Sequence, residues 1–266
     1  MTGLFVTATD TGVGKTWVAC ALARAAARRG LRVSVMKPCE TGDGDDGARL
    51  LDAAGRPLDA ALARPYRFHL PASPEVAARA EGAVVDVAHI EASFARLTRD
   101  ADFTLVEGAG GLLVPLAPGV LMADLAARLG LPLLVVARAS LGTVNHTLLT
   151  IEAARARKLP IAGVVLSRAV DTTGPEEPTN PEAMAAYGRV PILGLFPHGR
   201  DADAVADRDA LALRVRADLA PQDVDQVALG DVGVHEVQAP LGRRGGLRDR
   251  RAGRGRDPQH VRAASA

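Results

Sequence analysis

The sequence predicts an α/β protein with a mostly parallel β-sheet, helices on both faces of the sheet, and a single domain. Short, continuously apolar segments alternate along the chain with amphipathic segments of helical periodicity. That pattern is typical of a parallel sheet covered on both sides. The chain has 266 residues, 48% of them hydrophobic, which is enough to bury one sizeable core.

Six apolar runs bounded by turn residues are predicted to be buried strands. They are residues 3–7, 31–36, 103–107, 131–137, 161–166 and 190–196. Ligands of such sheets bind outside the carboxyl ends of the strands. Five loops that carry polar or glycine-rich motifs follow these strands, so we expect them to converge on one edge of the sheet.

Helices are predicted between the strands, where apolar residues recur at helical spacing. The segments are residues 14–29, 45–54, 86–100, 122–130 and 144–158. Gly30 is a favourable residue for ending the first helix. Residues 64–75 are punctuated by proline and are expected to form a loop.

The charge is unevenly distributed along the chain. Residues 241–266 contain eight Arg and two Asp, a net charge of +6, whereas the whole chain carries +1, which leaves about −5 for residues 1–240. We expect residues 1–221 to form the domain and residues 222–266 to be a disordered Arg-rich tail, because the tail has too little apolar content to bury a face. It lacks interleaved aromatic residues, so no specific nucleic-acid binding is expected.

Composition excludes several classes of protein. No stretch approaches the roughly 18 apolar residues of a membrane helix, and the N-terminus has no secretory signal pattern. The two cysteines, Cys20 and Cys39, form neither a disulfide framework nor a metal-ligand spacing. A cytoplasmic protein without membrane partners is expected.

The stretch ATDTGVGKT (residues 8–16) ends in Gly-Lys-Thr, as phosphate-binding loops do. The usual pattern has glycine where this chain has Thr9. Because the stretch follows an apolar strand and opens a helix, its N–H groups suit phosphate oxygens. Lys15 could reach β- and γ-oxygens, and the Thr16 hydroxyl could ligate Mg²⁺. The alternative is a plain strand-to-helix turn with a surface lysine.

Lysine is rare in this chain. Of 32 basic residues only three are lysines: Lys15, Lys37 and Lys158. Lys37 opens the second loop, KPCETG, at the end of a predicted strand, where it could face a transferred phosphoryl group as a second cation. The alternative is a solvated lysine. Cys39 has no paired base nearby in sequence and is interpreted as a packing residue.

Three carboxylates lie in these loops: Asp10, Asp46 and Glu107. Magnesium at a phosphate site needs one or two carboxylates together with substrate oxygens and water. Glu107 ends an apolar strand directly before a glycine-rich turn, so its side chain should face the ligand edge. Glu107 could instead cap that turn, and Asp46 could simply cap the helix that follows it.

The fourth loop, SLGTVNH, ends at another predicted helix N-terminus, whose N–H groups would suit a carboxylate. The alternative is ordinary capping by Ser140 or Thr143. His146 on that helix is interpreted as a packing residue in preference to a ligand.

Taken together, the motifs VTATDTGVGKT, MKPCETG, LVEGAGGLLVPL, ADLAARLGLPLLVVARASLGTVNHTLLT and GVVLS resemble the dethiobiotin synthetases, over about residues 2–200. The resemblance implies a P-loop NTPase-like fold and a homodimer. It also implies an ATP- and Mg²⁺-dependent cyclo-ligase that turns 7,8-diaminononanoate and CO₂ into dethiobiotin. In that family an amine becomes a carbamate, which attacks the γ-phosphate. The second amine then closes the ureido ring.

The resemblance also implies roles for residues. Thr11, Lys15 and Lys37 would hold the phosphates and the carbamate, and Thr16, Asp46 and Glu107 the metal. Thr41 would contact the carbamate or diamine. A second subunit would bind the distant substrate carboxylate through Gly142, Thr143, Val144 and Asn145. The implied ATP-binding residues are Gly12, Val13, Gly14, Lys15, Thr16, Trp17, Asp46, Glu107, Gly108, Ala109, Gly110, Ser167, Arg168, Pro197, His198 and Gly199.

The chain departs from the family pattern in two loops. Ala8 stands where members commonly begin the first loop with glycine, which adds a methyl group near the turn. Ser167 stands where members often carry an asparagine that contacts the adenine, and a serine has fewer donors than a carboxamide. Backbone groups of residues 197–199 could contact the base instead.

Two rival functions share the loop and the sheet. A P-loop partitioning or positioning ATPase generally carries a second lysine at the start of the first loop, where this chain has Thr7, Ala8 and Thr9. A cobyrinate-type amidoligase usually needs a glutaminase domain, and the mostly polar residues after 200 cannot form one. Both alternatives are therefore less favoured than the dethiobiotin synthetase function.

Overall fold

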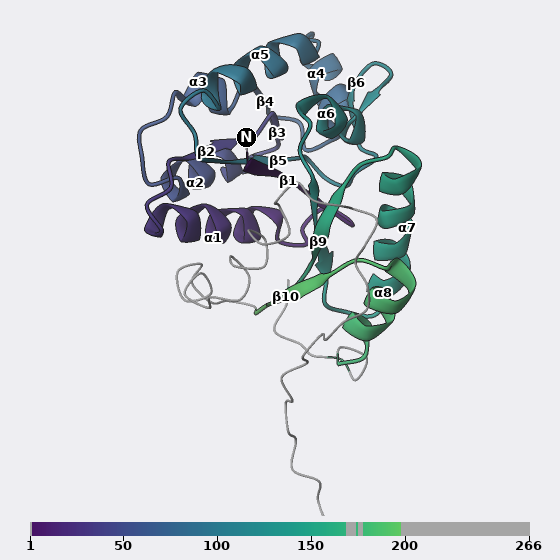
Figure 1. Cartoon of the computed structure of the whole chain (residues 1–266). Helices are drawn as coiled ribbons and strands as arrows, with labels where there is room; N and C mark the ends of the chain where they lie inside the picture. Colours follow the sequence, from purple (N-terminus) through teal and green to yellow (C-terminus); the bar gives the residue numbers. More distant parts are fainter. Residues whose placement is uncertain (1, 169–173, 175–177, 198–266) are drawn as a thin grey trace, which may run out of the picture. The chain divides into compact units, whose positions relative to one another are not determined.

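The computed structural model of the chain describes residues 2–168, 174 and 178–197. Six parallel strands form its main sheet, in the order β10-β9-β8-β1-β5-β2 (Figure 1). The predicted α/β fold is confirmed, and each predicted strand overlaps a strand of this sheet. The strands are β1 (Thr2–Ala8), β2 (Val33–Met36), β5 (Phe103–Glu107), β8 (Leu133–Arg138), β9 (Ile161–Ser167) and β10 (Ile192–Phe196).

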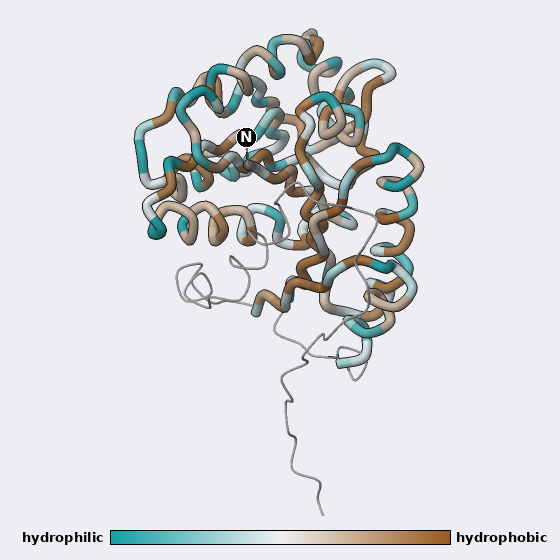
Figure 2. Tube along the Cα trace, viewed as in Figure 1, coloured by the Kyte–Doolittle hydropathy of each residue, from teal (hydrophilic) through white to brown (hydrophobic). Residues whose placement is uncertain are grey.

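Helices cover both faces of the sheet, as predicted. On one face α1 (Lys15–Arg28) and α2 (Asp46–Ala53) pack over one hydrophobic cluster of the core. On the other face a second cluster includes residues of α4 (Pro74–Ala80), α5 (Val87–Leu97), α6 (Met122–Leu129), α7 (Thr143–Ala156) and α8 (Asn180–Gly188). Figure 2 shows hydrophobic residues concentrated along the central strands and hydrophilic residues on the outer sides of the helices.

Several short elements were not predicted. They are β3 (Cys39–Thr41), α3 (Ala60–Ala63), β4 (Tyr66–Phe68), β6 (Pro115–Ala117) and β7 (Val120–Leu121). The helices α4 and α8 were not predicted either. Residues 64–75, expected to be a loop, contain β4 and the first two residues of α4, so the loop expectation holds only for residues 64–65 and 69–73. β4 forms because it pairs in parallel with β3, from Cys39 with Tyr66 to Thr41 with Phe68. A three-residue strand depends on such a tertiary partner, and local sequence patterns do not show it.

The strand register brings three sequence motifs to one edge of the sheet. Val6 of β1 is paired with Glu107 of β5, and Met36 of β2 with Val106. Lys37, directly after Met36, therefore emerges beside Glu107. The chain leaves β1 toward β5 and β2 on one side and returns to β8 on the other, so the carboxyl end of β1 lies at a topological switch point, where ligands of open α/β sheets bind.

None of the helices in the described part of the chain has the length and apolar character needed to cross a bilayer. The Arg-rich residues 222–266 lie outside the described residues, so their predicted disorder and the domain boundary at 221 stay predictions.

Candidate active site

The turn between β1 and α1 has the backbone of a phosphate-binding loop. Gly12 and Gly14 have φ angles of 71° and 98°, which a residue with a Cβ adopts only at a cost. Gly14 is the N-cap of α1, and no side chain in the described part of the chain caps this helix. The first-turn N–H groups are therefore suited to phosphate oxygens. Val13 is buried, whereas Thr11 and Trp17 are exposed on the loop and on the first turn of α1.

The departure at Ala8 has a simple structural account. Ala8 is the last residue of β1, is fully buried and pairs with Val136 of β8. It has no positive φ angle, so its methyl group packs in the core without backbone strain. The left-handed turns are made four and six residues later, by glycines that this chain retains.

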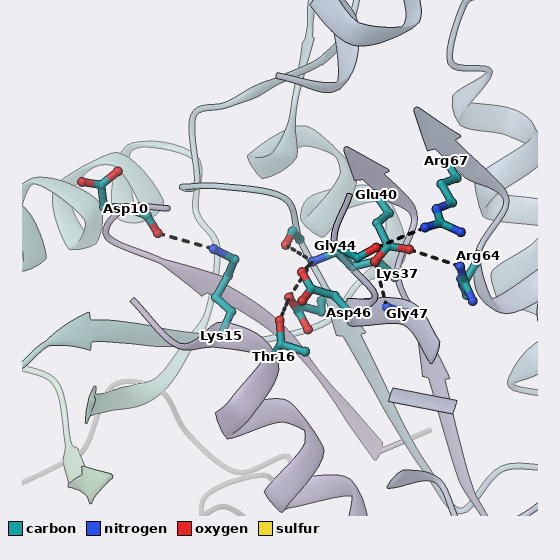
Figure 3. A network of polar contacts seen from close by, with 12 residues as sticks. Asp10, Lys15, Thr16, Lys37, Glu40, Gly44, Asp46, Gly47, Arg64 and Arg67 are labelled. Atoms are coloured by element: carbon teal, nitrogen blue, oxygen red, sulfur yellow. Dashed lines mark hydrogen bonds and ion pairs between the residues drawn. The ribbon is translucent and has the colours of Figure 1, made fainter. Parts of the chain in front are cut away.

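Lys15 is buried, and its Nζ donates a 3.4 Å hydrogen bond to the carbonyl oxygen of Asp10. Burial lowers the pKa of Lys15, and repulsion from the nearby Lys37 ammonium lowers it further, while Glu107 and Asp46 oppose the shift. The two lysines thus act on each other electrostatically. Figure 3 shows that Lys15 is directed toward the Asp10 turn, whereas Lys37 is directed into the carboxylate cluster.

Lys37 is at the centre of that cluster. Its Nζ lies 2.5 Å from Glu107 Oε1, 3.1 Å from Asp46 Oδ2 and 3.5 Å from the carbonyl oxygen of Gly108. Burial alone would lower the pKa of Lys37, but the attraction of Glu107 and Asp46 outweighs it and raises that pKa. Burial would likewise raise the pKa of Asp46, but Lys37 reverses the effect and lowers it. Lys37 is therefore a buried, charged lysine, and the solvated alternative is wrong.

Thr16 joins the same cluster from the first turn of α1. Its hydroxyl donates a 2.8 Å hydrogen bond to Glu107 Oε1, and it also interacts with the Asp46 carboxylate. Asp46 is the first residue of α2 and follows the N-cap residue Asp45; its carboxylate is occupied by Lys37 instead of capping the helix. The cap alternative for Asp46 was therefore wrong.

The donor set of this cluster fits a magnesium ion bound to a phosphate. Within the described residues, Glu107 Oε2 is buried and has no hydrogen-bond partner, which is costly for a carboxylate oxygen unless a cation or a donor reaches it. One hydroxyl and two carboxylates, next to a phosphate loop, match the few protein ligands that Mg²⁺ takes beside substrate oxygens. Thr16, Asp46 and Glu107 would hold the ion, as the resemblance implies.

The turn after Glu107 packs against the phosphate loop. A Cβ on Gly111 would lie 3.3 Å from the Ala8 carbonyl oxygen, and one on Gly110 would lie 2.7 Å from Val114 Cγ2 and 3.6 Å from Thr11 Oγ1. A Cβ on Gly108 would lie 3.0 Å from Phe5 Cε1. These close approaches explain why the turn is rich in glycine. They bring Gly108, Ala109 and Gly110 to the same edge as the loop.

The remaining residues of the second loop serve packing and position. Cys39 is buried in the core, and burial raises its pKa to about 12. It therefore stays protonated at neutral pH, in agreement with the packing interpretation. Thr41, the last residue of β3, is half-buried and is paired with Phe68 of β4.

The fourth loop ends at the N-terminus of α7. Gly142, with a φ angle of 90°, is the N-cap of α7. Neither Ser140 nor Thr143, nor another side chain of the described residues, caps that helix, so the capping alternative was wrong. Thr143 is buried, Val144 is half-buried and Asn145 is exposed. His146 is also exposed, which contradicts the packing interpretation.

A pocket of about 430 Å³ lies beside the phosphate loop. One wall is the outer side of that loop, from Ala8 to Thr11, and another is the turn from Gly111 to Val114. The third wall is one face of α7, formed by His146, Leu149, Thr150 and Ala153. This cavity was not predicted, because its walls come from three separate parts of the sequence.

Ser167, at the end of β9, faces the phosphate loop. It is only 3% exposed, and a Cβ on Gly14 would lie 2.6 Å from Ser167 Oγ. Its hydroxyl is therefore packed against the loop. Arg168 donates its backbone N–H to the carbonyl oxygen of Phe196, one residue before Pro197. His198 and Gly199 lie outside the described residues.

The fold and the site define a P-loop nucleotide-binding protein of the α/β class. Two solved structures share this fold. One is the MinC:MinD cell division protein complex of Aquifex aeolicus, with a TM-score of 0.53, 14% identity, and 82% and 95% of the two chains covered. The other is the signal recognition particle 54 kDa protein of Aeropyrum pernix K1 in complex with GDP, with a TM-score of 0.51, 18% identity, and 82% and 48% covered.

Sequence relatives define the family more narrowly. A family model described as "AAA domain" matches residues 2–206. The chain is 52% identical over 204 residues to the ATP-dependent dethiobiotin synthetase of Anaeromyxobacter dehalogenans (strain 2CP-C), covering 74% of this chain and 90% of the relative. It is 42% identical to that of Bacillus cereus (strain B4264), with 74% and 84% covered. The chain therefore belongs to the ATP-dependent dethiobiotin synthetase family.

Proposed function

We propose that this protein is an ATP-dependent cyclo-ligase of biotin biosynthesis, which forms dethiobiotin from 7,8-diaminononanoate, CO₂ and ATP and releases ADP and phosphate. Membership of the family supports an ATP-dependent ligase that makes dethiobiotin. The observation that carries the finer proposal is the position of Lys37, whose ammonium lies beside Asp46 and Glu107 at the edge where the phosphate loop ends.

The reaction would proceed through two intermediates formed on the substrate. An amine of the diamine and CO₂ form a carbamate, whose oxygen attacks the γ-phosphate and displaces ADP. The mixed carbamic-phosphoric anhydride is then attacked at its carbonyl carbon by the second amine, which closes the ureido ring and expels phosphate. This chemistry needs positioning and charge neutralisation more than a covalent protein group.

Separate residues would supply these two functions. The N–H groups at the start of α1, with Lys15 and Thr11, would hold the triphosphate. Lys37 would neutralise charge on the carbamate and the transferred phosphoryl group. Magnesium, held by Thr16, Asp46 and Glu107, would supply Lewis-acid neutralisation of the phosphate oxygens. A planar guanidinium at position 37 would not replace the compact ammonium.

The pocket beside the loop suits the substrate chain. Its walls combine apolar side chains, such as Leu112, Leu113 and Leu149, with polar ones near Thr11. An amine end could therefore lie near the phosphates while the methylene chain contacts apolar surface. Thr41 would contact the carbamate or diamine from the end of β3.

A homodimer is part of the proposal. Leu113, Leu141, Leu149 and Tyr187 are large apolar residues with exposed fractions of 47%, 83%, 60% and 75%. Leu113 and Leu149 both line the pocket, and α7 packs against α8, which carries Tyr187. Exposed large apolar residues that lie together, as Leu113 and Leu149 do, are typical of a protein interface. The uncapped N-terminus of a second copy's α7, with its Gly142, Thr143, Val144 and Asn145, would bind the substrate carboxylate.

The proposal also covers location and the tail. A cytoplasmic enzyme whose partners are small molecules and a second copy, without nucleic acid or membrane, fits the composition. The residues beyond 221 would be an appendage that the reaction does not use.

The test is direct detection of the product. Purified protein is incubated with 7,8-diaminononanoate, bicarbonate, MgCl₂ and ATP, and dethiobiotin is measured by mass spectrometry. The proposal expects a product that gains the carbon of ¹³C-bicarbonate and appears with one equivalent of ADP. The proposal would be contradicted if no labelled cyclic urea formed and the rate of ATP hydrolysis were the same with and without the diamine.

A further inference from the structure

Asp46 reaches the metal cluster from a turn that needs external support. It is the first residue of α2, an eight-residue helix that begins after the glycine-containing turn 42–45. The N-cap Asp45 makes no side-chain cap hydrogen bond. The N–H groups of the first turn therefore need another acceptor. Without one, the start of α2 would be poorly fixed, and so would the Asp46 carboxylate that it carries.

Glu40 supplies that acceptor from β3. Its Oε1 accepts a 3.2 Å hydrogen bond from the N–H of Gly47, the second residue of α2 (Figure 3). A carboxylate at this position also interacts favourably with the positive end of the helix dipole. Glu40 is only 1% exposed, so its charge must itself be compensated inside the protein.

Arg64 provides that compensation. Its Nη2 lies 3.4 Å from Glu40 Oε2, and that oxygen has no hydrogen-bond partner within the described part of the chain. The stem of Arg64 also covers Gly47, because a Cβ at residue 47 would lie 2.6 Å from Arg64 Cδ. One side chain thus balances the charge of Glu40 and covers the start of α2.

The same short segment also holds the strand end that carries Lys37. The carbonyl oxygen of Ala63, directly before Arg64, accepts a 2.8 Å hydrogen bond from the N–H of Lys37. Ala63 therefore holds the main chain of Lys37, whereas Arg64 lies against Gly47, the residue after Asp46.

We propose that Glu40 and Arg64 are positioning residues that hold Asp46 and the start of α2 in the geometry needed to bind the divalent cation. The inference rests on the proposed function only in taking Thr16, Asp46 and Glu107 as the metal ligands. Neither Glu40 nor Arg64 needs to contact the substrate. Groups that orient metal ligands typically change metal affinity 10- to 100-fold when they are removed.

The experiment measures metal binding directly. Mn²⁺ binding to the ADP complex of the full-length protein is followed by electron paramagnetic resonance, with thermal unfolding of each variant in parallel. Glu40→Gln keeps an oxygen for the Gly47 N–H but removes the charge that Arg64 balances. Arg64→Met keeps most of the stem but removes the guanidinium, and Gly47→Ala displaces Arg64. Glu91→Gln, at the exposed Arg128–Glu91 pair of α5 and α6, is the matched control.

The proposal expects the Mn²⁺ dissociation constant to rise at least tenfold in Glu40→Gln, Arg64→Met and Gly47→Ala, and to stay within twofold in Glu91→Gln. Turnover should recover in part at high Mg²⁺, while the KM for the diamine changes little. Arg64→Lys keeps the positive charge, so its Mn²⁺ dissociation constant should rise less than that of Arg64→Met. If the other variants do not fold, the Mn²⁺ affinity of Arg64→Lys tests the proposal. Lowered thermal stability with unchanged Mn²⁺ affinity would overturn the proposal.

The binding assay contains no diamine, so its outcome is separable from the proposed function. A protein that binds Mn²⁺ and ADP with this dependence on Glu40 and Arg64, yet makes no dethiobiotin, would remove the proposed reaction and leave the positioning role in place.

Discussion

The ammonium group of Lys37 lies 2.5 Å from the carboxylate of Glu107, and both side chains are almost completely buried. Each charge compensates the other in a region where water cannot. Because Glu107 also accepts the hydroxyl of Thr16, the pair joins the phosphate loop to the second loop. The expected chemistry of the site depends on this junction.

Replacement of Glu107 by glutamine should remove a proposed metal ligand and leave Lys37 with one carboxylate partner. We expect kcat/KM to fall on the order of 10²- to 10³-fold, since a metal ion stabilises charge on phosphate oxygens by several kcal/mol. Steady-state kinetics over a range of Mg²⁺ concentrations measures this, with Glu91→Gln as a control of the same chemical change. Wild-type Mg²⁺ dependence in the Glu107 variant would remove it from the metal site.

Gly14→Ala should disturb the phosphate loop more than other glycine substitutions. The new methyl group would meet Ser167 Oγ at 2.6 Å, and the φ angle of 98° is itself unfavourable for alanine. We expect a loss of about 1–3 kcal/mol in stability from strain, together with weaker ATP binding.

Gly119→Ala is the matched control for that variant. Gly119 has a φ angle of 71°, and a Cβ added to it would meet nothing within 4 Å, so it has the backbone strain without the collision. Urea unfolding and nucleotide titration of both variants separate the two effects. Equal ATP affinity in the two variants would show that the contact with Ser167 is unimportant.

Leu149→Asp should weaken the proposed homodimer. A charge at position 149, whose leucine is 60% exposed on α7, would be buried without a partner when a second copy covers it. Light scattering after size-exclusion chromatography should show a shift toward the monomer. Val84→Asp, at an apolar residue that is 69% exposed and lies between α4 and α5, should leave the mass unchanged. An unchanged mass for Leu149→Asp would argue against this interface.

The acid stability of the fold should depend on Asp102. Two side-chain hydrogen bonds from Arg32 hold the pKa of Asp102 at about 2, below its ordinary value of 3.8. Because the folded-state pKa is lowered, the stabilisation is present above pH 3.8 and is lost as the pH falls toward 2. Urea unfolding midpoints of wild type and Asp102→Asn should therefore converge over this range. A difference that stays constant down to pH 2 would contradict the assignment.

The sequence predicted the long elements well because each carries its own periodicity. The apolar run of β5, Phe103–Glu107, was located with both ends correct. By contrast, β3 and β4 are only three residues long and form by pairing with each other, so no local pattern indicates them. The helix α3 is a single turn of four residues, too short to show helical periodicity.

Part of the candidate site could also be predicted from the sequence. Lys37, Asp46 and Glu107 were singled out by their places after apolar strands and at a helix start, and the structure brings them together. Glu40 and Arg64 were not, because they are 24 residues apart and nothing local pairs a carboxylate in one short strand with an arginine that follows a short helix. The available signal was the place of Glu40 in the KPCETG motif, between the candidate site residues Lys37 and Thr41. His146 was misjudged, because exposure on a helix depends on what packs beside it.

The most direct test of the account is the separation of ATP binding from ring closure in Lys37→Gln. Trp17 is the only tryptophan of the chain and directly follows Thr16 of the phosphate loop, so its fluorescence should report nucleotide binding. The account predicts that ATP still perturbs this fluorescence in Lys37→Gln, whereas dethiobiotin is no longer formed at saturating ATP, Mg²⁺ and diamine. Turnover near the wild-type rate in that variant would contradict the central role of Lys37.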